Sequence, residues 1–145
     1  MHRGLSVDLT GRTALVTGAS SGIGAAVAEA YARSGARVYI NYPDPSQAAP
    51  AEAVIAAIAA EGGEAMGVMA DVSDEAQVDA MFATVESGSQ SLDILVNNAG
   101  IAHSSPVESL ATMDFRRVMD VHVLGTFLCS RAAPVSYTHL RAHET

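Results

Sequence analysis

The sequence predicts an α/β fold built on a parallel, doubly wound sheet, and three observations support this prediction. Short runs rich in β-branched and aliphatic residues alternate with helical patterns along the chain. A glycine-rich turn joins the first of these runs to the first helix. Of the 145 residues, 49% are hydrophobic and 17% are charged, which is typical of a globular chain with a buried sheet. Because complete domains of this kind are usually longer, we expect a sheet truncated after about four strands.

The first strand, helix and strand follow from the positions of glycine and of the β-leaning runs. Residues 13–17 predict a strand, which leads through the glycine-rich residues 18–24 into a helix over residues 25–33. Gly35 ends that helix, and residues 37–41 predict the second strand, which a Pro-Asp-Pro segment closes. These elements make a complete βαβ unit.

The middle of the chain repeats this alternation. An alanine-rich helix is predicted over residues 47–61, where two glycines stop it, and residues 65–70 predict a third strand. Ser73 is expected to cap the next helix, which continues to about residue 86 with its apolar side chains on one face. That pattern predicts a surface helix.

The last predicted elements are a strand and two helical segments. Residues 93–97 predict a fourth strand, and the loop over residues 98–106 leads to helical patterns over residues 108–117 and 118–133. The single cysteine, Cys129, lies in the second pattern, where we expect a small buried apolar side chain rather than a reactive thiol.

The charge balance excludes several classes of partner. The formal net charge is -8, and no cluster of cations is present, so nucleic acid and anionic membranes are not expected as partners. No apolar run approaches the roughly 20 residues of a membrane span, and the first residues do not resemble a signal peptide. We therefore expect a cytoplasmic protein. Lys and Arg together number 8, and every one is arginine.

Three glycines at the end of the first strand predict a phosphate-binding turn. Gly18, Gly22 and Gly24 leave backbone amides open to a diphosphate, and the dipole of the following helix adds a favourable field. Their spacing, G-x-x-x-G-x-G, differs from the G-x-G-x-x-G fingerprint and from the lysine-containing P-loop, which argues against an ATPase. The alternative is a tight turn with a purely structural role.

The segment Thr17-Gly-Ala-Ser-Ser-Gly-Ile-Gly24 resembles the cofactor loop of the short-chain dehydrogenase/reductase family. Asp71-Val72 resembles the adenine-pocket pair of that family, and Asn97-Asn-Ala-Gly100 resembles its N-N-A-G motif, in the same order. The resemblance covers about residues 9–133 and implies a Rossmann-like fold. We therefore expect residues 1–133 to form a partial NAD(P)-binding Rossmann domain and residues 134–145 to be a non-native tail.

The resemblance implies a set of cofactor-binding residues. They are Gly18, Ser20, Ser21, Gly22, Ile23 and Gly24 at the diphosphate, Asn41 and Tyr42 at the end of the second strand, Asp71 and Val72 at the adenine, and Asn98, Ala99 and Gly100 toward the ribose and nicotinamide. Some residues of these motifs have an alternative structural role. Thr17 and Asn97 are candidates to tie neighbouring strands together by hydrogen bonds, and for Asn97 we favour this role over contact with the cofactor. Gly100 is a candidate to permit a turn.

The end of the second strand favours NADP over NAD. An acidic residue there would accept hydrogen bonds from the adenosine ribose and repel a 2′-phosphate, but the sequence has Asn41-Tyr42. Ser21 stands where NADP-using members of the family often have a cation, and Asp44 lies nearby, so NAD remains the alternative.

The resemblance implies an active site that uses Ser, Tyr and Lys, commonly with an Asn that supports a proton-relay water. His122 occupies the usual Asn position and is the one catalytic candidate, with helix packing as its alternative role. Tyr137 and Arg141 have the spacing of a Tyr-x-x-x-Lys pair, but they come about twenty residues too early, and arginine does not replace lysine. With no lysine present, we expect these 145 residues to be inactive as an enzyme.

The tail has a separate resemblance. Residues 135–145, Val-Ser-Tyr-Thr-His-Leu-Arg-Ala-His-Glu-Thr, resemble one reading frame of a transposase-based DNA sequencing adapter. We expect such a segment to lie outside the fold. A natural polar tail whose histidines bind a metal is the alternative, and we assign no metal ligands.

Taken with the motifs, the resemblance implies an NAD(P)H-dependent oxidoreductase that transfers a hydride between nicotinamide and a carbonyl or secondary alcohol. It is nearest to the 3-oxoacyl-carrier-protein reductase and sugar dehydrogenase branches. The alternative is a dinucleotide-binding sensor or scaffold that performs no hydride transfer. The implied partners are a small-molecule substrate and, for the complete enzyme, further copies of itself in a homo-oligomer.

Overall fold

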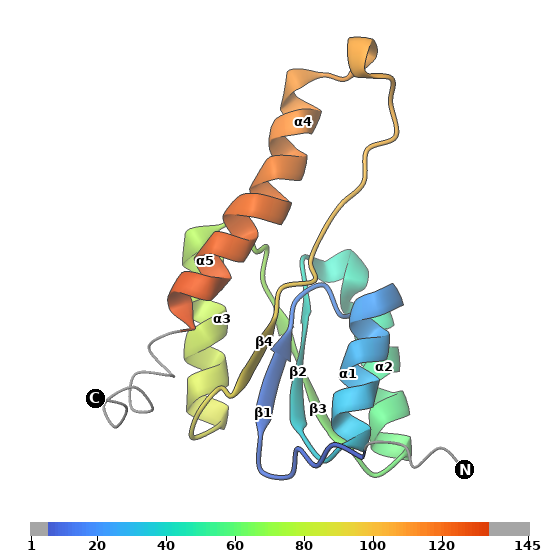
Figure 1. The fold of residues 1–145 in the computed structure, drawn as a ribbon, viewed down its shortest axis with the longest axis vertical. Helices are drawn as coiled ribbons and strands as arrows, with labels where there is room; N and C mark the ends of the chain where they lie inside the picture. Colours follow the sequence, from blue (N-terminus) through green and yellow to red (C-terminus); the bar gives the residue numbers. More distant parts are fainter. Residues whose placement is uncertain (1–5, 134–145) are drawn as a thin grey trace.

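The computed structural model describes residues 6–133 and has one sheet with helices on both faces. The strands are β1 (Thr13–Val16), β2 (Arg37–Tyr42), β3 (Glu64–Met69) and β4 (Ile94–Val96). They are all parallel and lie in the order β3-β2-β1-β4. The predicted α/β, Rossmann-like fold is thus confirmed (Figure 1).

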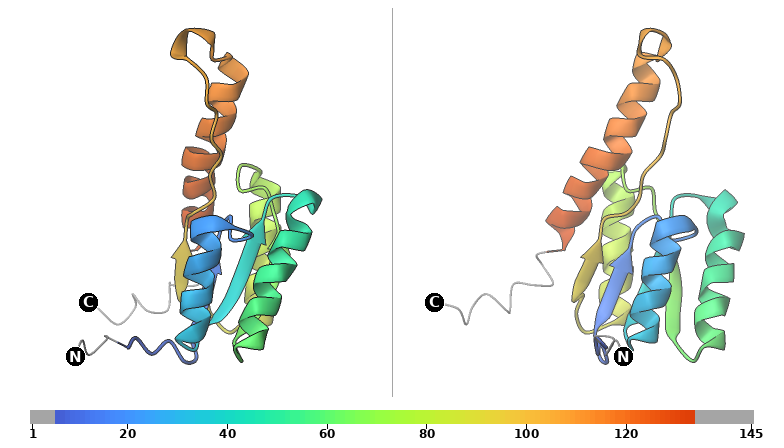
Figure 2. Two further views of the ribbon diagram at one scale, coloured as in Figure 1. Left: turned by 90° about the vertical axis from the view of Figure 1, so that its right-hand side faces the viewer. Right: turned by 45° about the vertical axis from the view of Figure 1, so that its right-hand side comes forward.

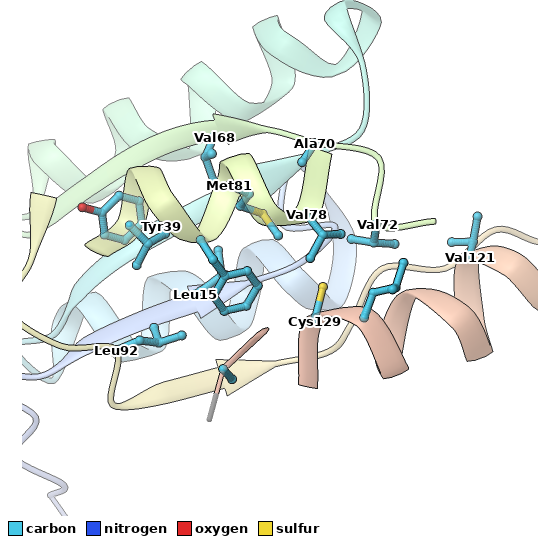
Figure 3. Close-up of a cluster of buried hydrophobic side chains, with 14 residues drawn as sticks. Leu15, Tyr39, Val68, Ala70, Val72, Val78, Met81, Leu92, Val121 and Cys129 are labelled. Atoms are coloured by element: carbon cyan, nitrogen blue, oxygen red, sulfur yellow. The ribbon is translucent and has the colours of Figure 1, made fainter. Parts of the chain in front are cut away.

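Alternating side chains of the central strands fill two cores, one on each face of the sheet. Ala14 and Val16 of β1 point to the face covered by α1 (Gly22–Arg33) and α2 (Ala48–Ala60). Leu15, between them, points to the opposite face, against α3 (Glu75–Gly88) and α5 (Gly125–Ala132). Figure 3 shows this second cluster, in which Leu15 and Tyr39 face Met81. Because β1 is buried on both sides, it is the centre of the fold.

A long helical arm follows β4. The arm consists of a single 3-10 turn at Val107–Ser109, α4 (Thr112–Met119), a π-helical stretch at Asp120–Leu124, and α5. The predicted helix over residues 108–117 therefore begins later than expected. Figures 1 and 2 show α4 and the loop before it projecting beyond the carboxyl ends of the strands.

The start of α3 also differs from the prediction. Asp74, not Ser73, is the N-cap, and its carboxylate accepts a hydrogen bond from the Gln77 amide at 3.1 Å. The Ser73 hydroxyl instead donates to Asp71, 2.6 Å away. The predicted cap at Ser73 is therefore wrong, because both residue types suit a cap and the Ser73 hydroxyl is bonded to Asp71.

Cys129 is fully buried in α5, as predicted, and burial raises the pKa of its thiol to about 11. Within residues 6–133, no helix has the length and apolar character needed to cross a membrane.

Candidate nucleotide-binding site

A cavity of about 360 Å³ opens at the carboxyl ends of the strands. The chain places β2 on one side of β1 and β4 on the other, so the cavity lies where strand order reverses, the usual ligand position in open α/β sheets. Eight of the predicted cofactor-binding residues line it: Gly18, Ser20, Ser21, Asn41, Asp71, Val72, Ala99 and Gly100. The other residues of its lining are Pro43, Asp44, Gln47, Ala70, Ile101, Arg117 and Val121.

The glycines of the first turn have distinct roles. Gly18 has a φ of +61°, and a Cβ on it would lie 2.8 Å from the Ala99 Cα, so only glycine fits between the two loops. A Cβ on Gly24 would lie 2.5 Å from the Gly18 carbonyl oxygen. Gly22 has a φ of +58° but open space around it, with nothing within 4 Å of the position of a Cβ. The surface above Gly22 is therefore accessible to a ligand.

The amino end of α1 carries backbone donors that no side chain caps. Ser21 is the N-cap, with an extended backbone, and it makes no capping hydrogen bond. The first amides of a helix lack partners within the helix, so those of residues 22–24 are available to an anion together with the helix dipole. Gly22, Ile23 and Gly24 do not line the cavity themselves but follow directly on Ser21, which does, and the Ile23 side chain is 78% exposed.

Thr17 and Asn98 join the glycine turn to the loop after β4. The Thr17 hydroxyl donates to the Val96 carbonyl at 3.3 Å and accepts from the amides of Asn98 and Ala99 at 3.0 and 2.9 Å. The Asn98 amide group donates to the Thr17 and Gly18 carbonyls, both at 3.0 Å. Thr17 therefore joins the end of β1 to the end of β4, as the structural alternative predicted. Asn98, expected at the ribose, does not line the cavity.

Asn97 lies on the other side of this loop. Its side-chain amide donates to the Ser130 hydroxyl of α5 at 3.1 Å. The asparagine therefore connects the end of β4 to the helix that follows, and it is not part of the cavity lining.

Asn41 is buried and fully engaged with the backbone. Its side-chain oxygen accepts from the Gly18 amide at 3.1 Å, and its nitrogen donates to the Ala70 and Val68 carbonyls at 3.0 and 3.3 Å. This side chain, 1% exposed, ties the glycine turn to the end of β3. Tyr42 packs on the α1–α2 core and does not line the cavity.

The wall after β2 comes from residues that the motifs do not include. Asp44 accepts from the Ser46 amide at 2.8 Å and begins a short 3-10 helix, Pro45–Gln47. Gln47 accepts a hydrogen bond from the Ser20 hydroxyl at 3.1 Å. The Pro-Asp-Pro segment after the second strand indicates a turn at this place, but it does not indicate that Pro43 and Gln47 line a cavity.

Asp71 is held by two neighbours at the opposite end of the cavity. Its Oδ1 accepts from the amide and hydroxyl of Ser73, at 2.9 and 2.6 Å, and its Oδ2 accepts from the Arg117 guanidinium at 2.8 Å. Partial burial would raise the pKa of Asp71, but the hydrogen bonds from Ser73 and then Arg117 outweigh it and keep that pKa below its ordinary value. No motif indicated Arg117.

Val72 forms the apolar floor beside Asp71. It is 4% exposed, and a Cβ on Gly125 would lie 2.6 Å from a Val72 methyl group, so α5 packs closely against it. Figure 3 shows Val72 and Val121 next to each other on this side of the core.

His122 lies behind the loop after β4, on the π-helical stretch. Its Nε2 is 3.0 Å from the Ile101 amide nitrogen and 2.8 Å from the Ile101 carbonyl oxygen. A Cβ on Gly100 would lie 2.5 Å from the His122 Cε1, so Gly100 permits the imidazole to approach. His122 does not line the cavity. Tyr137, Arg141 and the adapter-like tail lie outside the described residues.

The chain matches known proteins over most of its length. The model of the short chain dehydrogenase family matches residues 12–138. The chain is 44% identical to the 3-oxoacyl-[acyl-carrier-protein] reductase of Synechocystis sp., covering 86% of this chain and 49% of that protein. It is 43% identical to glucose 1-dehydrogenase 2 of Bacillus subtilis, covering 87% of this chain and 48% of that protein.

Solved structures agree with this match. A short chain dehydrogenase from Burkholderia cenocepacia J2315 in complex with NADP superposes with a TM-score of 0.83 at 40% identity, covering 88% of this chain and 51% of the other. A dehydrogenase/reductase from Sinorhizobium meliloti 1021 gives a TM-score of 0.85 at 39% identity, with 90% and 51% covered. The chain spans about half the length of the curated relatives it matches.

Proposed function

The chain belongs to the short-chain dehydrogenase family, and from this premise we propose that the whole protein is an NAD(P)-dependent oxidoreductase. Its reaction would transfer a hydride between nicotinamide and a carbonyl or secondary alcohol, with a small molecule as substrate. The observation that carries the proposal is the cavity where strand order reverses, with open space above Gly22 and uncapped amides at the start of α1.

Each part of the cavity has a task in this proposal. The amides of residues 22–24 would bind the diphosphate, with the helix dipole behind them. Asp71 and Val72 would receive the adenine, and Ala99 and Gly100 would line the path toward the nicotinamide. Thr17, Asn41 and Asn98 would act indirectly, because their side chains fix the two loops that form the walls. A bound nicotinamide would supply or accept the hydride.

Proton transfer requires groups that these 145 residues do not supply. The sequence contains no lysine, so the Tyr-Lys pair that the family resemblance implies is not formed within it. We propose that this chain by itself binds the dinucleotide without turnover. For His122 we propose a positioning role, in which its Nε2 holds the Ile101 backbone and thereby the turn at Gly100.

We propose NADP as the preferred cofactor, with NAD as the alternative. The support is the absence of a carboxylate at Asn41-Tyr42 and the 40% identity to the Burkholderia cenocepacia dehydrogenase crystallised with NADP. Asp44 opposes this preference, because its carboxylate lines the cavity and would repel a 2′-phosphate.

Two matched glycine substitutions test the site. Gly22→Ala places a methyl group in the open space above the turn that adjoins the cavity. Gly62→Ala makes the same change at a φ of +83° in the loop between α2 and β3, also with nothing within 4 Å. Each costs about 1 kcal/mol of backbone strain. We expect Gly22→Ala to weaken NADPH binding at least about tenfold, the loss of one charge-assisted contact, while Gly62→Ala leaves it unchanged.

Calorimetric titration of the 145-residue chain with NADPH provides the measurement. Equal affinities for the two variants and the parent chain would contradict a diphosphate site at this turn. Absence of any NADPH binding to the parent chain would contradict the proposed function.

A dinucleotide-binding sensor or scaffold is the second candidate, and the cavity where strand order reverses supports it equally. Both candidates bind NADPH. Turnover of a carbonyl substrate by the whole protein separates them, since a sensor would bind the cofactor and oxidise none of it.

A further inference from the structure

Arg117 connects the helical arm to the nucleotide cavity. It lies on α4, and its guanidinium donates one hydrogen bond to Asp71 Oδ2 at 2.8 Å and another to the Ser73 hydroxyl at 2.6 Å. Asp71 and Arg117 both line the cavity. Among the described residues of the lining, Arg117 is the one cation.

These contacts fix the position of the Asp71 carboxylate but leave one of its oxygens able to accept a further hydrogen bond. Oδ1 accepts two hydrogen bonds, both from Ser73, whereas Oδ2 accepts one among the described residues, from Arg117. A carboxylate oxygen accepts two hydrogen bonds, so Oδ2 retains a lone pair. The Asp71 side chain is 26% exposed and lines the cavity.

The same contacts restrict what Arg117 itself can do. Its Nη1 and Nη2 are directed at Ser73 and Asp71, and pairing with the carboxylate offsets its charge. An arginine in this arrangement orients an acceptor more effectively than it attracts a phosphate. The geometry therefore favours a role through Asp71.

We propose that Arg117 is a positioning residue that makes the cavity selective for a purine with a 6-amino group. The proposal rests on the proposed function, because it needs the nucleotide to enter this cavity. With Arg117 in place, Asp71 is ionised and presents only acceptors. An amino group at purine position 6 donates to such a carboxylate, whereas a carbonyl oxygen at that position is repelled by it.

The neighbouring residue supplies a matched control. Arg116 is also an exposed arginine on α4, so Arg116→Met and Arg117→Met make the same change in charge and size one position apart. The contacts with Asp71 and Ser73 belong to Arg117. A general effect of lost positive charge would appear in both variants.

The test measures AMP and IMP binding to the 145-residue chain by NMR titration. We expect the parent chain and Arg116→Met to bind AMP more tightly than IMP. Arg117→Met should weaken AMP binding about tenfold and remove most of the preference over IMP, and Arg117→Lys should restore part of it.

A double substitution separates positioning from simple damage to the fold. Asp71→Asn replaces the acceptor by an amide that also donates, so we expect the preference to move toward IMP. If Arg117 acts through Asp71, adding Arg117→Met to Asp71→Asn should not change the AMP to IMP ratio further. Far-UV circular dichroism of each variant checks that the fold is retained.

The outcomes are distinguishable. Unchanged AMP and IMP affinities in Arg117→Met, or an equal loss of both, would overturn the positioning role while leaving the proposed function intact. A parent chain that binds neither AMP nor NADPH would overturn both proposals.

Discussion

Asn41 has a different task from the one its sequence position suggests. The end of the second strand is where a side chain is expected to meet the adenosine ribose. Asn41 is instead 1% exposed, and its amide is bonded to Gly18 and Ala70. At the residue scale, the exposed charged side chain of the lining on this side of the cavity is Asp44, three residues further on.

Neutralising Asp44 should increase the preference for a 2′-phosphate. Asp44→Asn keeps a side chain able to cap the short 3-10 helix but removes a negative charge from the cavity wall. We expect the affinity for 2′,5′-ADP relative to 5′-ADP to rise about threefold, the size of one partly solvated charge interaction. Calorimetry at low ionic strength measures both ligands.

The control for this prediction is Glu52→Gln, which removes an exposed carboxylate from α2 outside the cavity. It should leave the ratio unchanged. The effect of Asp44→Asn should also shrink at high salt, because solvent ions screen exposed charges. A ratio that is insensitive to Asp44→Asn would exclude Asp44 from cofactor selection.

Single residues were predictable where a local motif identifies them. The glycines at 18, 22 and 24 follow from their spacing after the first strand, and Asp71 with Val72 from the resemblance to the family. Arg117 was not predictable, because its contact with Asp71 joins residues 46 positions apart and depends on where α4 lies. Such contacts are set by tertiary packing, which no spacing rule along the chain contains.

At the scale of elements, the strands and the first three helices could be read from periodicity, but the ends could not. The sequence favoured Ser73 as the cap of α3, and the structure has Asp74 there. Both residue types cap helices well, so the choice depends on the Asp71–Ser73 hydrogen bonds made at the end of β3. The π-helical stretch at Asp120–Leu124 is also invisible to a pattern with a helical period.

Removing the observed cap should destabilise the fold measurably. Asp74→Ala deletes the acceptor for the Gln77 amide at the start of α3, and we expect a loss of about 1 kcal/mol in the free energy of unfolding. Asp74→Asn should lose much less, because asparagine caps as well as aspartate. Urea denaturation followed by circular dichroism measures both. Equal stabilities for Asp74→Ala and Asp74→Asn would show that this hydrogen bond contributes little.

At the scale of the whole molecule, β4 is one of the two edges of the four-stranded sheet, and β3 is the other. Among the described residues β4 pairs with β1 on one side only, and its three residues are half-buried. The sequence predicted a parallel sheet that is truncated after about four strands. It did not predict the order of the strands, because alternating strands and helices fit several orders equally well.

An unpaired strand edge should promote association of the 145-residue chain. We expect light scattering to increase with protein concentration, since free backbone groups along β4 can pair with another molecule. A sharp cooperative melt of a stable monomer would contradict this prediction.

A double substitution tests which surface is responsible. Phe115 and Phe127 are each 53% exposed on the helical arm, which offers a second, apolar route to association. If the strand edge dominates, Phe115→Glu with Phe127→Glu should leave the scattering nearly unchanged. Loss of association in that variant would assign it to the arm.

The buried thiol of Cys129 has a practical consequence for spectroscopy. It is the single cysteine of the chain and is fully buried, so a thiol reagent does not reach it in the folded protein. A cysteine introduced at Glu61, in the loop before β3 and hence at the end of the sheet opposite the cavity, would be the one accessible thiol. A fluorophore attached there can report ligand occupancy without touching the walls that bind it.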